Sequence, residues 1–200
     1  MDVFDEDAVP FSLSEDAVDT DEAAPSADSA DDYDDDDLED ATDDDIDFVI
    51  EIHREDGAVA GSVLAPDLAN DFDELITQLQ RIPGDAGATG FVSIAGEFFV
   101  VVRVRGRMVQ VLLSDAGAAN DWPLARDIVD YLGEDVPDED EDTGPIGDLN
   151  LFADSGLSSF ELEQIAGNYD DDSDEVVARI ADKLRVTRQF EALIEAYDNQ

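Results

Sequence analysis

The sequence predicts an α+β fold, with an antiparallel five-stranded sheet in the order ββαβββα and a small helical C-terminal region after it. Two observations predict the sheet. Every second residue from Phe48 to Ile52 is large and apolar, and residues 90–113 contain three apolar runs separated by glycines. A third observation predicts the helical region, because after residue 147 the apolar residues recur every three to four positions.

The first two strands and the first helix follow from short local signals. The alternation of residues 48–53 is typical of a half-buried strand, and the turn sequence EDG at 55–57 leads into a second strand at 58–64. A helix is then expected behind a cap at Asn70 or Asp71, and Pro83 and Gly84 end it. Its apolar residues with helical spacing are Phe72, Leu75, Ile76 and Leu79.

The segment GFVSIAGEFFVVVRVRGRMVQVLLSD predicts three consecutive strands, at 90–95, 97–105 and 107–113. Gly96 and Gly106 mark the two turns between them. Because side chains alternate across a strand, one face of the middle strand is apolar and the other carries arginines. The apolar face holds Phe98, Val100, Val102 and Val104, and the opposite face holds Arg103 and Arg105.

A second helix follows, and the chain then divides into further segments. The sequence NDWPLARDIVDYLG predicts a helix with an N-cap at Asp121, Pro123 in its first turn and Gly133 just past its end. A capping box of Ser158 and Glu161 opens the C-terminal helices, which should pack on one another or on the sheet. The predicted segments are a disordered acidic arm (1–46), an α+β domain (47–133), an acidic linker (134–146) and a helical region (147–200).

Charge restricts the partners that the protein can bind. The chain has 55 acidic and 10 basic residues, and 22 of the acidic residues but no basic ones lie in residues 1–47. Contacts to nucleic-acid phosphates or to anionic membranes need clustered Lys and Arg, so direct binding to either is not expected. The composition favours a partner with a basic surface. The alternative is that the acidic residues only keep the protein soluble.

Several kinds of catalytic or metal site are excluded by residue type. The chain has no cysteine, so disulfides and thiolate-bound zinc are impossible. His53 begins the sequence HRE, which matches part of a zinc deaminase motif, but it is the only histidine and is expected to be a surface residue. The aspartate runs at 34–37, 43–45 and 170–172 lack the glycine and spacing of a calcium loop. We therefore expect no cofactor, no metal site and no catalytic residues.

The candidate functional residues are those that could contact a partner. Arg103, Arg105 and Arg107 form the one basic cluster of the sheet domain. They bind a partner's anionic groups, or they form a solvated sheet face, or they hold one of the chain's own acidic segments. The residues predicted to contact a partner are Asp34, Asp35, Asp36, Asp37, Asp43, Asp44, Asp45, Arg103 and Arg105.

Two stretches of the sequence resemble a known family. GEFFVVVRVRGRMVQVLLSDAGAANDWPLARDIVDYLG (96–133), the acidic linker after it and GDLNLFADSGLSSFELEQI (147–165) are similar to the tRNA adenosine deaminase-associated proteins of high-GC Gram-positive bacteria. The resemblance covers most of residues 47–195 and implies association with the enzyme that converts adenosine to inosine in tRNA anticodons. It implies no catalytic residues for the chain itself.

The sequence therefore predicts a non-enzymatic accessory protein that binds a basic tRNA-handling partner, with a tRNA adenosine deaminase suspected. A general acidic solubility protein or nucleic-acid mimic, with no specific partner, is the alternative. An enzyme that uses only Asp and Glu stays open as a third hypothesis, which a deep pocket with paired acids would support. The chain has no basic, apolar signal segment at its start and no apolar run of about 20 residues, so a cytoplasmic location is expected.

Overall fold

The computed structural model describes residues 38–84, 86–138, 141 and 143–199. The described residues all belong to one compact unit. Most of the predicted acidic arm, including Asp34, Asp35, Asp36 and Asp37, lies outside the described residues.

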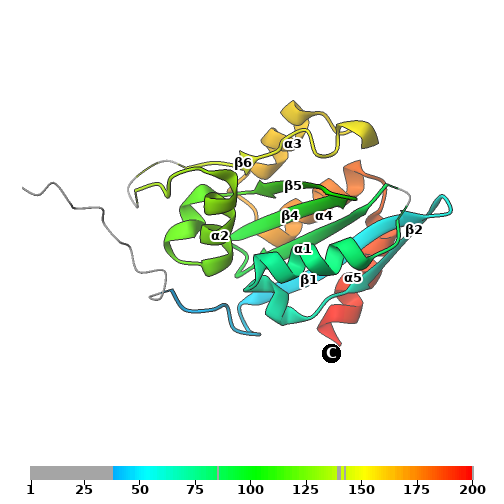
Figure 1. The fold of residues 1–200 in the computed structure, drawn as a ribbon, viewed down its shortest axis with the longest axis horizontal. Coiled ribbons are helices and arrows are strands. Elements are labelled where there is room, and N and C mark those ends of the chain that lie inside the picture. Colours follow the sequence, from blue (N-terminus) through cyan, green and yellow to red (C-terminus); the bar gives the residue numbers. More distant parts are fainter. Residues whose placement is uncertain (1–37, 85, 139–140, 142, 200) are drawn as a thin grey trace, which may run out of the picture. The chain divides into compact units, whose positions relative to one another are not determined.

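The fold is α+β, with helices packed around one antiparallel sheet (Figure 1). The sheet has the strand order β2-β1-β3-β4-β5-β6. Its strands are β1 (Ile46–Glu55), β2 (Ala58–Val63), β3 (Ala88–Ile94), β4 (Phe98–Arg105), β5 (Met108–Leu113) and β6 (Ile146–Gly147). The first five are the predicted strands, and their boundaries move by three residues at most.

The sixth strand corrects the predicted count of five. β6 pairs Ile146 with Leu113 and Gly147 with Leu112, at the point where the predicted acidic linker ends. A strand of two residues is too short to produce a periodic pattern, so the sequence does not predict it. A Cβ at Gly147 would lie 2.2 Å from the Val111 carbonyl oxygen, and φ is +102° there. Glycine is therefore what allows this segment to approach β5 so closely.

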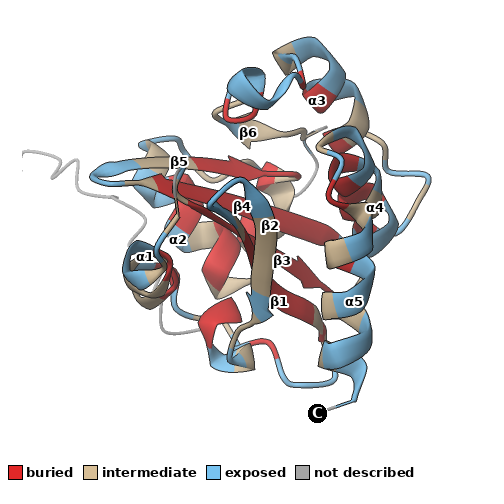
Figure 2. Ribbon diagram, turned by 90° about the vertical axis from the view of Figure 1, so that its right-hand side faces the viewer, coloured by how far each residue is buried: buried red, intermediate tan, exposed pale blue. Residues whose placement is uncertain are grey.

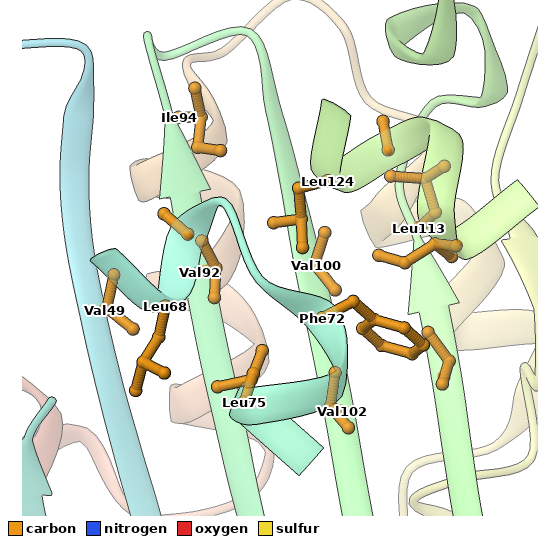
Figure 3. Packing of buried hydrophobic residues seen from close by; sticks show 14 of the residues in the cluster. Val49, Leu68, Phe72, Leu75, Val92, Ile94, Val100, Val102, Leu113 and Leu124 are labelled. Carbon is orange, nitrogen blue, oxygen red and sulfur yellow. The ribbon is translucent and has the colours of Figure 1, made fainter. Parts of the chain in front are cut away.

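One face of the sheet is covered by α1 (Phe72–Arg81), α2 (Pro123–Leu132) and two short 3-10 helices, η2 (Pro66–Ala69) and η3 (Ala116–Asn120). Figure 3 shows Phe72 and Leu75 of α1 above Val100 and Val102 of β4. The apolar face predicted for β4 is confirmed, because its four members belong to this core: Phe98, Val100, Val102 and Val104.

The other face is covered by the C-terminal helices α3 (Ser159–Ala166), α4 (Ser173–Lys183) and α5 (Thr187–Asp198), with the 3-10 helix η4 (Ala153–Ser155) nearby. Phe48 packs edge-on against Phe190 of α5, with ring centroids 5.6 Å apart, and Phe91 stacks on Phe152. The first strand, predicted to be half-buried, is therefore buried on both faces over Phe48–Ile52, as the red strands of Figure 2 show. The local pattern missed this because the covering helices lie about 130 residues further along the chain.

The helix ends agree with the predicted caps at all positions except one. Asp71 accepts a hydrogen bond from the Glu74 amide (2.8 Å), and Ser158 and Glu161 form the expected capping box. Gly133 ends α2 with φ +73°. The N-cap predicted at Asp121 is wrong. Trp122 holds that position, because η3 runs to Asn120 and leaves Asp121 as its own C-cap.

Candidate interaction surface

Acidic residues gather at one end of the sheet. Because the strands are antiparallel, the start of β1, the β3–β4 turn and the end of β5 meet there, as the pairs Ile46–Ile94 and Ile94–Phe98 require. We call the carboxylates of this region the acidic end. They are Asp43, Asp44, Asp45, Asp47, Glu97, Asp115, Asp121, Asp138, Glu141, Asp170, Asp171 and Asp172.

Basic residues gather at the opposite end, which we call the basic end. The last residues of β1 and β4, the β4–β5 turn, the end of α1 and the α4–α5 turn lie there. Its basic residues are Arg54, Arg81, Arg103, Arg105, Arg107, Lys183, Arg185 and Arg188. Acidic side chains, among them Glu55, Asp56, Asp154 and Asp182, also lie there, so this end carries much less net negative charge than the acidic end but has no excess of positive charge. A basic partner is attracted to the acidic end more strongly than to the rest of the folded unit.

Two open hollows lie side by side at the acidic end and share Glu97. The first, of about 350 Å³, is lined by Asp115, Asp121, Asp138 and Glu141, and the second, of about 270 Å³, by Asp170, Asp171 and Asp172. Each hollow has an aromatic side chain at its wall. The indole Nε1 of Trp122 donates to Glu97 (3.3 Å), and the Tyr169 hydroxyl donates to the Ser114 carbonyl oxygen (3.3 Å).

The side chains that line these hollows are suited to binding the arginine and lysine side chains of another protein. Arginine and lysine side chains bind carboxylates and also stack on aromatic rings, so the combination suits a basic peptide segment. Partial burial, with a smaller effect of the Asp115 charge, raises the pKa of Tyr169, which therefore stays neutral near pH 7. Among the described residues, no group of three His, Asp or Glu side chains is placed to hold a metal ion.

The three predicted contact residues Asp43, Asp44 and Asp45 lie in the turn before β1, at the acidic end. Asp43 and Asp44 are exposed, whereas Asp45 accepts hydrogen bonds from the side chain and amide of Thr42 (2.6 and 2.9 Å). These bonds lower the pKa of Asp45 and fix the turn. The acidic arm therefore joins the folded unit at the end of the sheet where the other carboxylates gather.

The structure places Arg103 inside the protein, with 5% of its surface exposed. Its guanidinium donates two hydrogen bonds to Asp154 (2.6 and 2.9 Å), a third to the Leu151 carbonyl oxygen, and lies 5.8 Å from the centre of the Phe152 ring. Arg105 also donates to Asp154 (3.0 Å), while Arg107 is exposed. The hydrogen bond from Arg103 is the main cause of the lowered pKa of Asp154. These two arginines therefore hold an acidic residue of their own chain.

Sequence reasoning did not single out Asp154 or the polarised ends. Asp154 is one acid among 55 and lies 51 residues from Arg103, so no local signal connects them. The polarity did leave a signal in the turns. In a run of antiparallel strands alternate turns share one end, and the turn AGE (95–97) is acidic whereas RGR (105–107) is basic.

His53 is not the surface residue that the sequence predicts. Its side chain is 12% exposed, and its Nδ1 lies 2.9 Å from the carboxylate of Glu51, whose side chain is only 2% exposed and whose strand, β1, has neighbours on both sides. Ser62 donates to the other oxygen of that carboxylate (2.8 Å). Glu51 and His53 point to the same face of β1 because they are two residues apart. The buried carboxylate thus has two hydrogen-bond partners. The role of His53 is structural, because it is one of them.

We expect Glu51→Ala to destabilise the protein by about 1–3 kcal/mol, because it empties a buried position and leaves the partly buried His53 ring without its acceptor, whereas the exposed Ser62 hydroxyl can turn to water. The matched control is Glu55→Ala at the exposed end of the same strand, which should change stability by about 0.5 kcal/mol or less. Urea unfolding followed by circular dichroism measures both. Equal losses in the two variants would contradict the assigned role of Glu51.

Comparison with known proteins supplies the family. Residues 47–187 match the family described as Rv3753c-like tRNA adenosine deaminase-associated protein. The chain belongs to this family. The match starts at β1 and ends at the first residue of α5, so the family region includes the sheet and most of the helices on both of its faces.

A relative within this family is Protein Rv3753c of Mycobacterium tuberculosis. It is 32% identical to the chain over 151 residues, which cover 74% of this chain and 87% of the relative. The resemblance predicted from the sequence is therefore confirmed. No solved structure matches the chain. Within the part of the chain that the structure describes, no helix is both long and apolar enough to span a bilayer.

Proposed function

We propose that this deaminase-associated protein is a non-enzymatic accessory protein that binds a basic, tRNA-handling partner, a tRNA adenosine deaminase, through its acidic end. The observation that carries the proposal is the polarised charge of the folded unit, together with the acidic arm that joins it at the same end. An enzyme that handles tRNA needs basic surface to contact phosphates, and such a surface is complementary to these carboxylates.

In this function the carboxylates contact the partner, whereas Arg103 and Arg105 bind Asp154 of the same chain and do not take part. The arm, with Asp34, Asp35, Asp36 and Asp37, would steer the partner from a distance, whereas Asp43, Asp44 and the two hollows would make close contact. The chain itself lacks the means to be the deaminase, because the known zinc deaminases need cysteine ligands and it has none. The proposed function implies a cytoplasmic location, where tRNA is modified.

Calorimetric titration of the full chain with the tRNA adenosine deaminase of the same organism tests this function. We expect a complex at 50 mM salt that weakens at 300 mM salt, because exposed charges are screened beyond about 6–14 Å at these concentrations. A chain that lacks residues 1–37 should still bind, more slowly. If that chain lost all binding and unrelated basic proteins competed equally with the deaminase, general nucleic-acid mimicry would replace the proposal. Absence of any complex at 50 mM salt would reject both.

A further inference from the structure

A small pocket opens at the basic end, on the sheet face that the C-terminal helices cover. It has a volume of about 60 Å³ and lies between β1, β3 and β4 on one side and η4 and the α4–α5 turn on the other. None of the described residues that line it is acidic, whereas both hollows of the acidic end are lined by carboxylates. The pocket therefore suits a different kind of ligand. Its apolar walls are formed by Ile52, Phe91, Phe152, Leu184 and Val186.

Two hydrogen-bond donors inside this pocket have no acceptor. Thr89 and Arg103 are direct partners across β3 and β4, so their side chains lie side by side on the same face. Both residues are buried, with Thr89 9% exposed. Among the described residues, neither the Thr89 hydroxyl nor the Nε of Arg103 has a hydrogen-bond partner. No fully buried side-chain nitrogen or oxygen of these residues lacks a partner, so both donors reach open space, and the pocket is the space that both residues line.

The charges around the pocket favour an anion. Arg103 and Arg105 share the single carboxylate of Asp154, so these three side chains together carry one positive charge. Arg54 also lines the pocket, is exposed, and has no ion-pair partner among the described residues. The acidic residues 55–56 of the β1–β2 turn are exposed to water and do not line the pocket. A single negative charge placed against the two donors would therefore be stabilised.

We propose that this pocket binds a small aliphatic monocarboxylate, whose carboxylate accepts hydrogen bonds from the Thr89 hydroxyl and from the Nε of Arg103. A carboxylate only accepts hydrogen bonds, which is what two free donors require. Its alkyl chain packs against Phe91 and Phe152.

The size and walls of the pocket select this class of anion. One water needs about 10–15 Å³, so the pocket has room for about four non-hydrogen atoms, and a longer chain would extend through its open mouth. Phosphate is larger and more highly charged, and it would lose water to lie against apolar side chains. The pocket lies at the opposite end of the sheet from the surface proposed for the deaminase, so the inference does not depend on that function.

Titration of the ¹⁵N-labelled full chain with sodium butyrate, followed by NMR, tests the site. We expect saturable shifts of the Arg103 Nε–H signal and of the Gly87 and Thr89 amides, with a Kd of about 1 mM for a ligand of this size. Butyramide, which has the same shape without the charge, and inorganic phosphate should each bind at least tenfold more weakly. Equal affinity for either of them would overturn the assignment to a carboxylate.

The variant Thr89→Val removes one donor while keeping the shape of the side chain. It should bind butyrate at least tenfold more weakly, because a hydrogen bond to a charged group is lost. Its melting curve should not fall below that of wild type, since the Thr89 hydroxyl has no partner among the described residues. The matched control is Thr77→Val in α1, which covers the other face of the sheet, and it should bind as wild type does. No saturable shift in wild type up to about 50 mM butyrate, or shifts that persist in Thr89→Val, would overturn the proposal.

Discussion

Removal of residues 148–200 is expected to abolish cooperative folding of the remaining sheet. These residues supply the helices that cover one whole face, which holds Phe48, Ile50, Phe91, Phe99 and Val101. Burying each such side chain stabilises a protein by about 1.5–3 kcal/mol. The burial of these five side chains therefore contributes about as much as the whole net stability of a typical domain, which is about 5–15 kcal/mol. The truncated chain should show no sharp melting transition and should bind a hydrophobic dye.

The matched truncation is removal of residues 1–37 at the other end of the chain. The buried core among the described residues begins at Ala41, so this truncation should keep the native melting temperature within about 2–4 °C, the change that ~1 kcal/mol produces in a domain of this size. Circular dichroism melting curves of both truncated chains make the comparison. A cooperative transition in the chain that ends at residue 147 would show that residues 47–147 fold alone and would contradict this view of the C-terminal helices.

The second large effect is expected for Asp154→Ala, which should cost about 2–4 kcal/mol of stability. The variant leaves the Arg103 guanidinium buried with the Leu151 carbonyl oxygen as its remaining acceptor, and Arg105 nearby adds a like charge. We set the cost below the largest values for buried pairs because the Asp154 side chain itself is 46% exposed. The double variant Arg103→Met and Asp154→Ala removes both charges, so it should be more stable than Asp154→Ala alone.

This pair also predicts a dependence of stability on pH. Arg103 lowers the pKa of Asp154 in the folded protein relative to its unfolded value. The stabilisation is therefore fully present above the unfolded pKa, near 4, and is lost as the pH falls through the lower folded pKa. Urea unfolding should show a large difference between wild type and Asp154→Ala at pH 7 and a smaller one near pH 3. A difference that stays constant across this range would show that the charge of Asp154 is not what stabilises Arg103.

The parts of the fold that sequence predicts well are those fixed by local chemistry. Gly96 and Gly106 adopt positive φ at the two turns where the sequence places them, and the alternation of β4 assigns each side chain to the correct face. The Ser158 capping box is also a signal contained within four residues. Such features depend on backbone geometry and on neighbours close in sequence, which a single chain reveals.

The features that sequence does not predict are set by distant contacts. β6 is defined by its pairing with β5 and has no pattern of its own. Whether β1 is buried on one face or two depends on helices that begin more than 100 residues later. The candidate surface follows the same division. The acidic composition is evident from the sequence, but only the strand register brings Glu97, Asp121 and Asp170 to one end.

The central claim, that the acidic end binds the deaminase, is tested most directly by neutralising three of its exposed carboxylates. The variant Asp121→Asn, Asp170→Asn and Asp172→Asn changes side chains that lie at the two hollows. The control is Glu55→Gln, Asp56→Asn and Asp182→Asn, which removes the same charge from exposed positions near the basic end. Calorimetric titration with the deaminase at 100 mM salt compares the two affinities.

We expect the acidic-end variant to bind at least tenfold more weakly than wild type, a loss of about 1.4 kcal/mol. The control should bind within about threefold of wild type, because charges more than ~10 Å from the contact are screened at this salt concentration. Equal weakening of the two variants would show that only net charge matters, and unchanged binding in both would place the contact elsewhere. Either result would contradict the acidic end as the binding surface.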